Sequence, residues 1–186
     1  MRPVHLGPDE HPFATPSERR DPARRLRGRL VAPVTIWTAG DAGGAAAGLT
    51  VASVLVAEGE PPRLLGLIGP TTDLAERLAD SGAFVVHVLG VNDQALAERF
   101  AERRPPVQGQ FDGIEVTGSP WGPVLAGRRP RAACRLVGVR PTGTADLVEG
   151  IIEELVVDDL DEPMAWQRGA YRRLVPNGGD DDGGQA

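Results

Sequence analysis

One short segment of the chain carries groups that could hold an anion such as a phosphate. Residues 68–72 join a run of large aliphatic residues to the start of a helix at Asp73. The first turn of a helix presents free N–H groups and the positive end of its dipole, which both favour negative charge. Thr71 and Thr72 add two hydroxyl groups there. The segment predicts a phosphate site, but it also fits a plain helix cap, where the Asp73 carboxylate would repel a phosphate unless it turned away.

A second segment is marked by slender side chains. Thr50, Val51, Ala52 and Ser53 follow a Gly-rich turn and lie within a run typical of a strand. Small residues on a strand leave room for a flat ring, and two hydroxyls could contact its polar edge. From the spacing alone, Thr50 and Ser53 fit strand residues facing water at least as well.

The other reactive residues lack the partners that their chemistry would need. His87 lies alone in the apolar run FVVHVL, where a histidine is most often a core residue, so no metal-ligand cluster is expected. Cys134 is the one cysteine of the chain, which excludes an internal disulfide. The chain has no lysine and no G-x-G-x-x-G motif after a strand, which argues against a P-loop or a Rossmann nucleotide site.

Composition and charge narrow the class of protein further. The 186 residues include 24 glycines and 17 prolines but only 4% aromatic residues, which favours a strand- and loop-rich domain over a helical bundle. The formal charge of −6 disfavours nucleic acid as a partner, and the arginines clustered at positions 19–29 fit a solvated segment. No apolar run is long enough for a membrane helix and no signal peptide is recognised, so a cytoplasmic protein is expected.

The chain divides into one domain and two ends. Residues 1–25 are rich in proline and charge and predict an extended or disordered arm. Residues 26–176 carry the periodic apolar pattern of a single domain, and residues 177–186 form an acidic, Gly-rich tail that is expected to be disordered.

Within that domain the pattern predicts mainly strands. Strands are expected at residues 34–38, 49–56, 63–68, 84–89, 131–140, 147–157 and 164–167. Two short helices are expected, one over DLAERLADSG with Asp73 at its start, and one over QALAERFAERR that ends at Pro105 and Pro106. This majority of strands with two small helices suits a closed barrel with helical caps, a mainly β (α+β) fold.

The order of these features resembles the flavin reductase-like family, whose fold is the FMN-binding split barrel. Residues 33–89 read PVTIWTAGDAGGAAAGLTVASVLVAEGEPPRLLGLIGPTTDLAERLADSGAFVVHVL and match, in order, four elements of the family pattern. These are a V-T-x-x-T strand, G-[ML]-T-x-x-S, a P-P pair, and S-G-x-F-x-V-[NH]-V-L. Near the other end, MAWQRGAYRRL resembles the closing L-V-Y-x-x-G-x-Y-x-x-L. The resemblance covers residues 28–175.

The resemblance implies a function and a set of site residues. It implies a homodimeric NAD(P)H:flavin oxidoreductase that binds FMN, or FAD, and serves a partner monooxygenase or another acceptor. By the family pattern, the strand at Thr50 lies along the flavin ring and Thr72 holds the position of a phosphate-binding serine. The implied cofactor-binding residues are Thr50, Val51, Ala52, Ser53, Ile68, Gly69, Pro70, Thr71, Thr72, His87, Trp166 and Tyr171. Trp166 and Tyr171 could equally plug the barrel end.

Some positions depart from the family pattern. Pro70 stands where a basic residue is often found. Counting back from Gly150 places Thr144 and Ala145 at the family's Asp-His pair, and neither can donate a proton at neutral pH. Two other functions therefore stay open: a flavin-binding electron carrier without a nicotinamide site, and a deazaflavin-dependent oxidoreductase of the same barrel.

Overall fold

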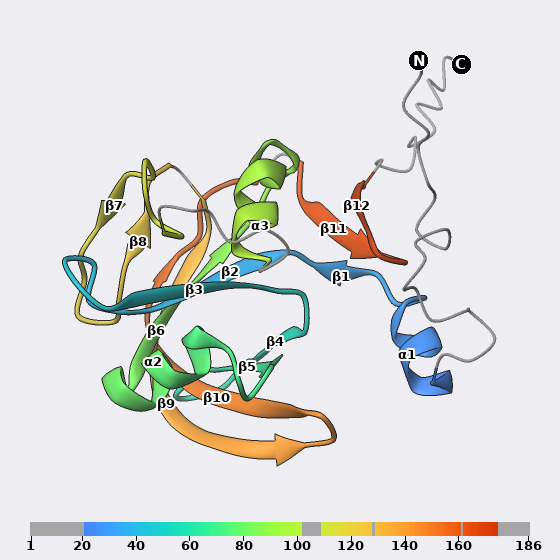
Figure 1. Ribbon diagram of the computed structural model, residues 1–186, viewed down its shortest axis with the longest axis horizontal. Helices are drawn as coiled ribbons and strands as arrows, with labels where there is room; N and C mark the ends of the chain where they lie inside the picture. The colour runs from blue at the N-terminus through green and yellow to red at the C-terminus, as the bar shows by residue number, and fades with distance from the viewer. Residues whose placement is uncertain (1–20, 102–108, 128, 161, 175–186) are drawn as a thin grey trace, which may run out of the picture.

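A curled antiparallel sheet of seven strands forms the body of the protein (Figure 1). The computed structural model describes residues 21–101, 109–127, 129–160 and 162–174. The sheet has the order β3-β2-β6-β9-β10-β5-β4, and every neighbouring pair is antiparallel. Its strands are β2 (Thr35–Gly40), β3 (Ala46–Val51), β4 (Val54–Ala57), β5 (Arg63–Ile68), β6 (Ala83–Val88), β9 (Arg131–Thr142) and β10 (Ala145–Val156).

The sheet curls so far that its two edges approach each other. The chain leaves β3 at one edge after Val51 and enters β4 at the opposite edge at Val54. Residues 52 and 53 make this crossing, and the carbonyl of Ser53 accepts a hydrogen bond from the N–H of Leu67 on β5 (3.1 Å). This short connection bridges the two edges of a half-barrel, in which no ladder pairs β3 with β4.

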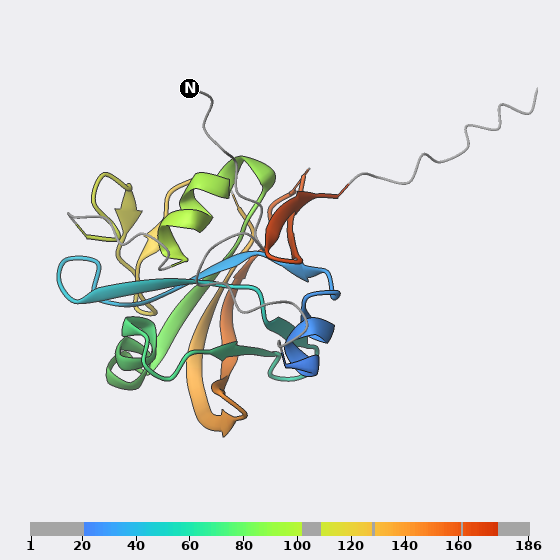
Figure 2. The same cartoon turned by 45° about the vertical axis from the view of Figure 1, so that its right-hand side comes forward.

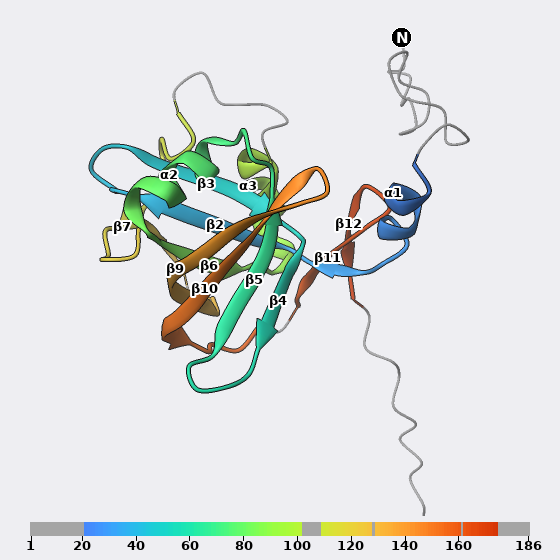
Figure 3. The same ribbon diagram turned by 90° about the horizontal axis from the view of Figure 1, so that it is seen from below.

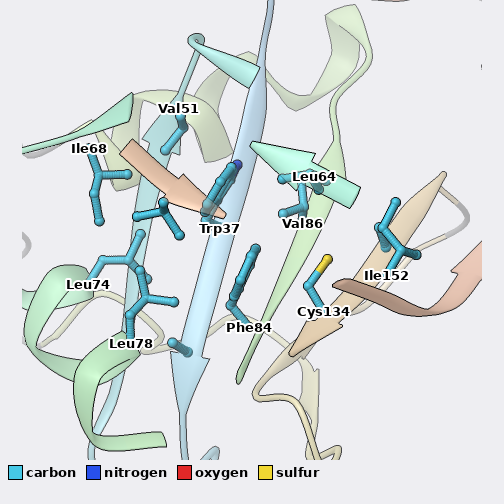
Figure 4. Close-up of a cluster of buried hydrophobic side chains, with 13 residues drawn as sticks. Trp37, Val51, Leu64, Ile68, Leu74, Leu78, Phe84, Val86, Cys134 and Ile152 are labelled. Carbon is cyan, nitrogen blue, oxygen red and sulfur yellow. The ribbon is translucent and has the colours of Figure 1, made fainter. Parts of the chain in front are cut away.

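A packed core fills the inside of the curl (Figure 4). The rings of Trp37 and Phe84 stack with centroids 4.9 Å apart and planes 8° apart. The helix α2 (Asp73–Ser81) covers this core with Leu74 and Leu78, which are one turn apart and buried. Gly82 ends the helix in a left-handed conformation (φ 65°), as the sequence predicts.

The outer face of β2 and β6 is covered by a second layer (Figure 2). This layer contains α3 (Gln94–Phe100), the hairpin of β7 (Val116–Thr117) and β8 (Val124–Leu125), and the small sheet of β1 (Ala32–Pro33), β11 (Met164–Gln167) and β12 (Ala170–Arg173). Phe100, Leu125 and Met164 form the centre of its apolar cluster. A short 3₁₀ helix, η2 (Val91–Asp93), leads into α3.

The mainly β barrel with short helices confirms the fold expected from the sequence. One expected strand, 49–56, is in fact two strands at opposite sheet edges, because the crossing at 52–53 breaks the pairing. Residues 22–25 are helical rather than extended, since they belong to α1 (Pro22–Arg27), which the side chain of Asp21 caps. The arm up to residue 20, the Pro105–Pro106 stop and the tail 177–186 lie outside the described residues.

Candidate functional site

The crossing at Ala52 and Ser53 brings the two segments of the sequence analysis together. Because Ser53 bonds to Leu67, the slender residues of the crossing lie beside the end of β5, where residues 68–72 begin. Gly66 makes this approach possible, since a Cβ there would lie 2.5 Å from the Trp37 ring and 3.1 Å from the Ser53 carbonyl oxygen. Ala52 and Ser53 are both half-buried. The fold therefore places the two segments side by side.

Thr50 and Val51, which precede the crossing, both make contacts within the protein. The hydroxyl of Thr50 donates to the carbonyl of Ala97 on α3 (2.6 Å). The side chain of Val51 is buried in the core, and its carbonyl accepts from the hydroxyl of Thr35 (2.6 Å). Within residues 50–53, a ligand could therefore contact only the backbone and the side chains of Ala52 and Ser53.

The start of α2 provides polar groups for an anion. Thr72 is the N-cap residue: its hydroxyl accepts from the N–H of Ala75 (3.3 Å) and donates to the carbonyl of Gly69 (2.9 Å). Within the described part of the chain, the N–H groups of Asp73 and Leu74 have no hydrogen-bond partner, and they point along the helix axis toward its start. Thr71 is exposed beside them. These groups match the donors that a phosphate needs.

A pocket of about 370 Å³ opens at this helix start. It lies between α2 and the ends of β5, β9 and β10, and its size falls within the range of small-molecule sites. It is lined by Ile68, Pro70, Thr71, Thr72, Asp73, Ala75, Glu76, Leu78, Ala79, Val139 and Asp146. Its walls are apolar toward the barrel and polar at the helix start.

Asp146 and Val139 were not identified by the sequence analysis. Both belong to the β9–β10 hairpin, whose turn at Gly143 has a positive φ of 65°. Asp146 pairs with Ile68 across β10 and β5, which puts it at the pocket. Asp146 directly follows Ala145, which occupies the position of the family's histidine. That position is therefore one residue away from the pocket lining. This proximity is the signal that could have pointed to Asp146.

His87 lies in the core and not at the pocket. It is fully buried, and the N–H of Leu125 donates to its Nε2 (3.1 Å). The proton is therefore on Nδ1, which lies 3.3 Å from the carbonyl oxygen of Ile36 and can donate to it. Burial lowers the pKa of His87 to about 4, so the ring is neutral at pH 7. Both nitrogens contact backbone groups, and His87 does not line the pocket at the α2 start.

Trp166 and Tyr171 form a separate aromatic pair. They face each other across β11 and β12 with ring centroids 4.9 Å apart at 65°. Tyr171 lines a smaller hollow of about 210 Å³ together with residues of η2 and β12. In Figures 1 and 3 these two strands lie on the opposite side of the molecule from α2. Within one chain, Trp166 and Tyr171 therefore lie far from the pocket at Thr72.

Other kinds of site find no support in the described residues. In that part of the chain, no group of three or more His, Cys, Asp or Glu side chains could hold a metal ion. Burial raises the pKa of the Cys134 thiol to about 12, so it is not a nucleophile at neutral pH. None of the described helices is both long and apolar enough to cross a membrane.

A curled antiparallel half-barrel with a pocket between a capped helix and a barrel hairpin places this fold in the split-barrel class of proteins. The chain belongs to the flavin reductase-like family: the sequence model of the flavin reductase like domain matches residues 27–175. This confirms the resemblance seen in the motifs.

Several characterised proteins are similar to this chain. An NADH:riboflavin 5'-phosphate oxidoreductase of Streptomyces pristinaespiralis is 30% identical over 84% of this chain and 94% of its own length. The reductase subunit HsaB of a flavin-dependent monooxygenase of Rhodococcus jostii is 32% identical over 88% of this chain and 84% of its own. The structure of the NADH:FAD oxidoreductase SgcE6 of Streptomyces globisporus, in complex with NAD and FAD fragments, superposes with a TM-score of 0.75 at 26% identity, covering 84% of this chain and 93% of that one.

Proposed function

We propose that this protein is an NAD(P)H-dependent flavin reductase, a cytoplasmic homodimer that binds FMN or FAD and supplies reducing equivalents to a partner monooxygenase or another acceptor. Its relatives include an NADH:FMN oxidoreductase and a monooxygenase reductase subunit. One observation carries the proposal. The barrel closure places the slender Ala52–Ser53 crossing next to the loop that leads to the α2 start.

In this proposal each part of the pocket has one task. Beside the pocket, the backbone and small side chains of Ala52 and Ser53 lie along the flavin ring, where larger side chains would collide. The hydroxyl of Thr71 and the first N–H groups of α2 hold the phosphate, and the Thr72 hydroxyl can join them by turning its proton away from the Gly69 carbonyl. Ile68 and Leu78 exclude water from the apolar side. The flavin supplies the electron-accepting ring, so hydride transfer needs only stacking and alignment from the protein.

The reductase assignment is tested by steady-state oxidation of NADH and NADPH in the presence of FMN, FAD or riboflavin. We expect oxidation that depends on added flavin and saturates with it. The absence of flavin-dependent oxidation with either nucleotide, for a folded protein, would contradict the assignment.

One observation favours a second candidate, a flavin-binding electron carrier. Ala145, at the family's histidine position, gives the pocket rim no ionisable group, and Thr144 beside it is exposed. A carrier would bind FMN that dithionite reduces and NADH does not. For a reductase, Ala145→His should leave FMN affinity unchanged and raise the rate of reduction by NADH, with Thr144→His as the control at the exposed neighbour.

Trp166 and Tyr171 belong to the proposal only through a second subunit. Because they lie apart from the pocket within one chain, they could wall the flavin or nicotinamide only of a partner copy. Trp166→Leu should then weaken FMN binding if the ring walls the flavin, or raise KM for NADH at unchanged FMN affinity if it walls the nicotinamide.

A further inference from the structure

The phosphate end of the proposed site has no cation of its own. The described lining of the pocket includes the carboxylates Asp73, Glu76 and Asp146 but no arginine. Arg77 is the adjacent basic residue in the sequence, and its guanidinium pairs with Glu76 (2.7 Å) and Asp80 (2.9 Å). A phosphate bound at Thr72 would thus meet hydroxyls and N–H groups next to negative charge. A cation from elsewhere would remove this repulsion.

The helix α1 presents arginines that pair with no carboxylate in the part of their own chain that the structure describes. Within the described residues, no carboxylate pairs with Arg24, Arg25 or Arg27, and all three are exposed. The helix has only six residues and none of them is buried. Isolated helices of this length are not stable in water, so α1 needs a surface to pack on.

The apolar residues of this segment point to the same need. Leu26 is 63% exposed and Leu30 is 60% exposed, although both are large aliphatic residues next to the arginines. A helix with exposed leucines flanked by cations fits an apolar surface bordered by carboxylates. The pocket at the α2 start has this character, since the exposed Val139 and the edges of the core residues Ile68 and Leu78 line it beside three acidic residues.

The position of α1 prevents it from reaching the pocket of its own chain. The carbonyl of Gly28 accepts from the N–H of Arg168 (3.0 Å), and the carbonyl of Arg29 accepts from the side chain of Gln167 (3.4 Å). These bonds fix the end of α1 at the turn between β11 and β12. Figures 1 and 3 show α1 and α2 at opposite ends of the molecule.

We propose that two copies of this chain pair so that α1 of each packs beside the α2 start of the other and supplies arginine to the flavin phosphate. The pairing is symmetric: two equal contacts join the basic end of one copy to the acidic pocket of the other. Arg24, Arg25 and Arg27 are the candidate cations. The inference rests on the proposed flavin site and adds that the site is incomplete in a single copy.

The first test compares FMN with riboflavin, which lacks the phosphate. The triple variant Arg24→Gln, Arg25→Gln, Arg27→Gln should lose at least tenfold in FMN affinity by fluorescence titration, while riboflavin affinity stays within about twofold. Arg172→Gln, an exposed arginine on β12, serves as a control for lost charge and should change neither. Equal FMN affinity in the triple variant and the wild type would overturn the inference.

The second test asks whether the arginines act on their own chain or on the partner. The triple variant keeps the pocket, and a Thr72→Asp copy keeps α1 but has a charged pocket. A purified heterodimer of the two, made with different affinity tags, should bind FMN tightly at one site per two chains. Weak binding at both sites, or a wild type that sediments as a monomer with FMN bound, would overturn the inference while leaving the flavin site in place. A wild type that binds neither FMN nor riboflavin would overturn the proposed function as well.

Discussion

Thr72→Asp separates the charge at the α2 start from the structure of the helix. Aspartate is as good an N-cap residue as threonine, so the helix should keep its first turn. Because a carboxylate cannot donate to the Gly69 carbonyl, the stability should fall by about 1 kcal/mol. The added carboxylate would lie beside the N–H groups that the proposal assigns to the phosphate. Thr72→Asn is the matched control, because asparagine also caps a helix but carries no charge.

The expected size of the effect follows from Coulomb's law. At roughly 5 Å, two unit charges repel by about 0.8 kcal/mol in water and about 3 kcal/mol at an effective dielectric constant near 20. Thr72 is half-buried, so its environment lies between these limits. We expect FMN affinity to fall at least tenfold relative to Thr72→Asn, with a smaller loss at high salt and no loss for riboflavin. Equal FMN affinities of the Asp and Asn variants, measured by fluorescence titration at low salt, would refute the phosphate position.

Three further predictions concern the framework around the site. The pKa of His87 is about 4 in the folded protein and about 6.5 in the unfolded chain, so the free energy of unfolding should fall by roughly 3 kcal/mol as the pH drops from 7 to 4. In urea denaturation, His87→Asn should make the free energy of unfolding depend less on pH. An unchanged pH dependence would contradict the buried neutral ring. Gly66→Ala should cost about 1–3 kcal/mol because its Cβ would collide with Trp37, whereas Gly138→Ala, with nothing within 4 Å, should cost less than about 1 kcal/mol. Thr50→Val should lower stability by about 1 kcal/mol through loss of one partly buried hydrogen bond and leave FMN affinity within twofold; a large loss of FMN affinity would instead place the hydroxyl at the ligand.

The sequence predicted the helix and strand types of the barrel well, because local patterns determine them. Leu74 and Leu78 lie one turn apart and Gly82 follows, so the bounds of α2 could be read from spacing and capping. The same holds for the buried strand that ends at Ile68. The crossing at Ala52–Ser53 could not be predicted, since the run 49–56 has strand character throughout. Only the strand order of the folded sheet shows that the chain passes from one edge to the other within this run.

The candidate site was predicted in part for a similar reason. Thr71 and Thr72 were identified because a helix start is a local feature. Asp146 was missed because it reaches the pocket through strand register, which a single sequence does not reveal. His87 illustrates the opposite case: the apolar run around it indicated a core residue, whereas the family resemblance implied a cofactor contact. The structure buries the ring, and its two backbone partners come from distant segments.

The central claim is that the split-barrel pocket holds a flavin that NADH can reduce. The most direct measurement is the visible spectrum of the protein titrated with FMN under anaerobic conditions, followed by addition of NADH and then dithionite. We predict a shifted flavin spectrum on binding and bleaching by NADH to the same extent as by dithionite. Unshifted FMN, or bound FMN that bleaches with dithionite but not with NADH or NADPH, would contradict the account.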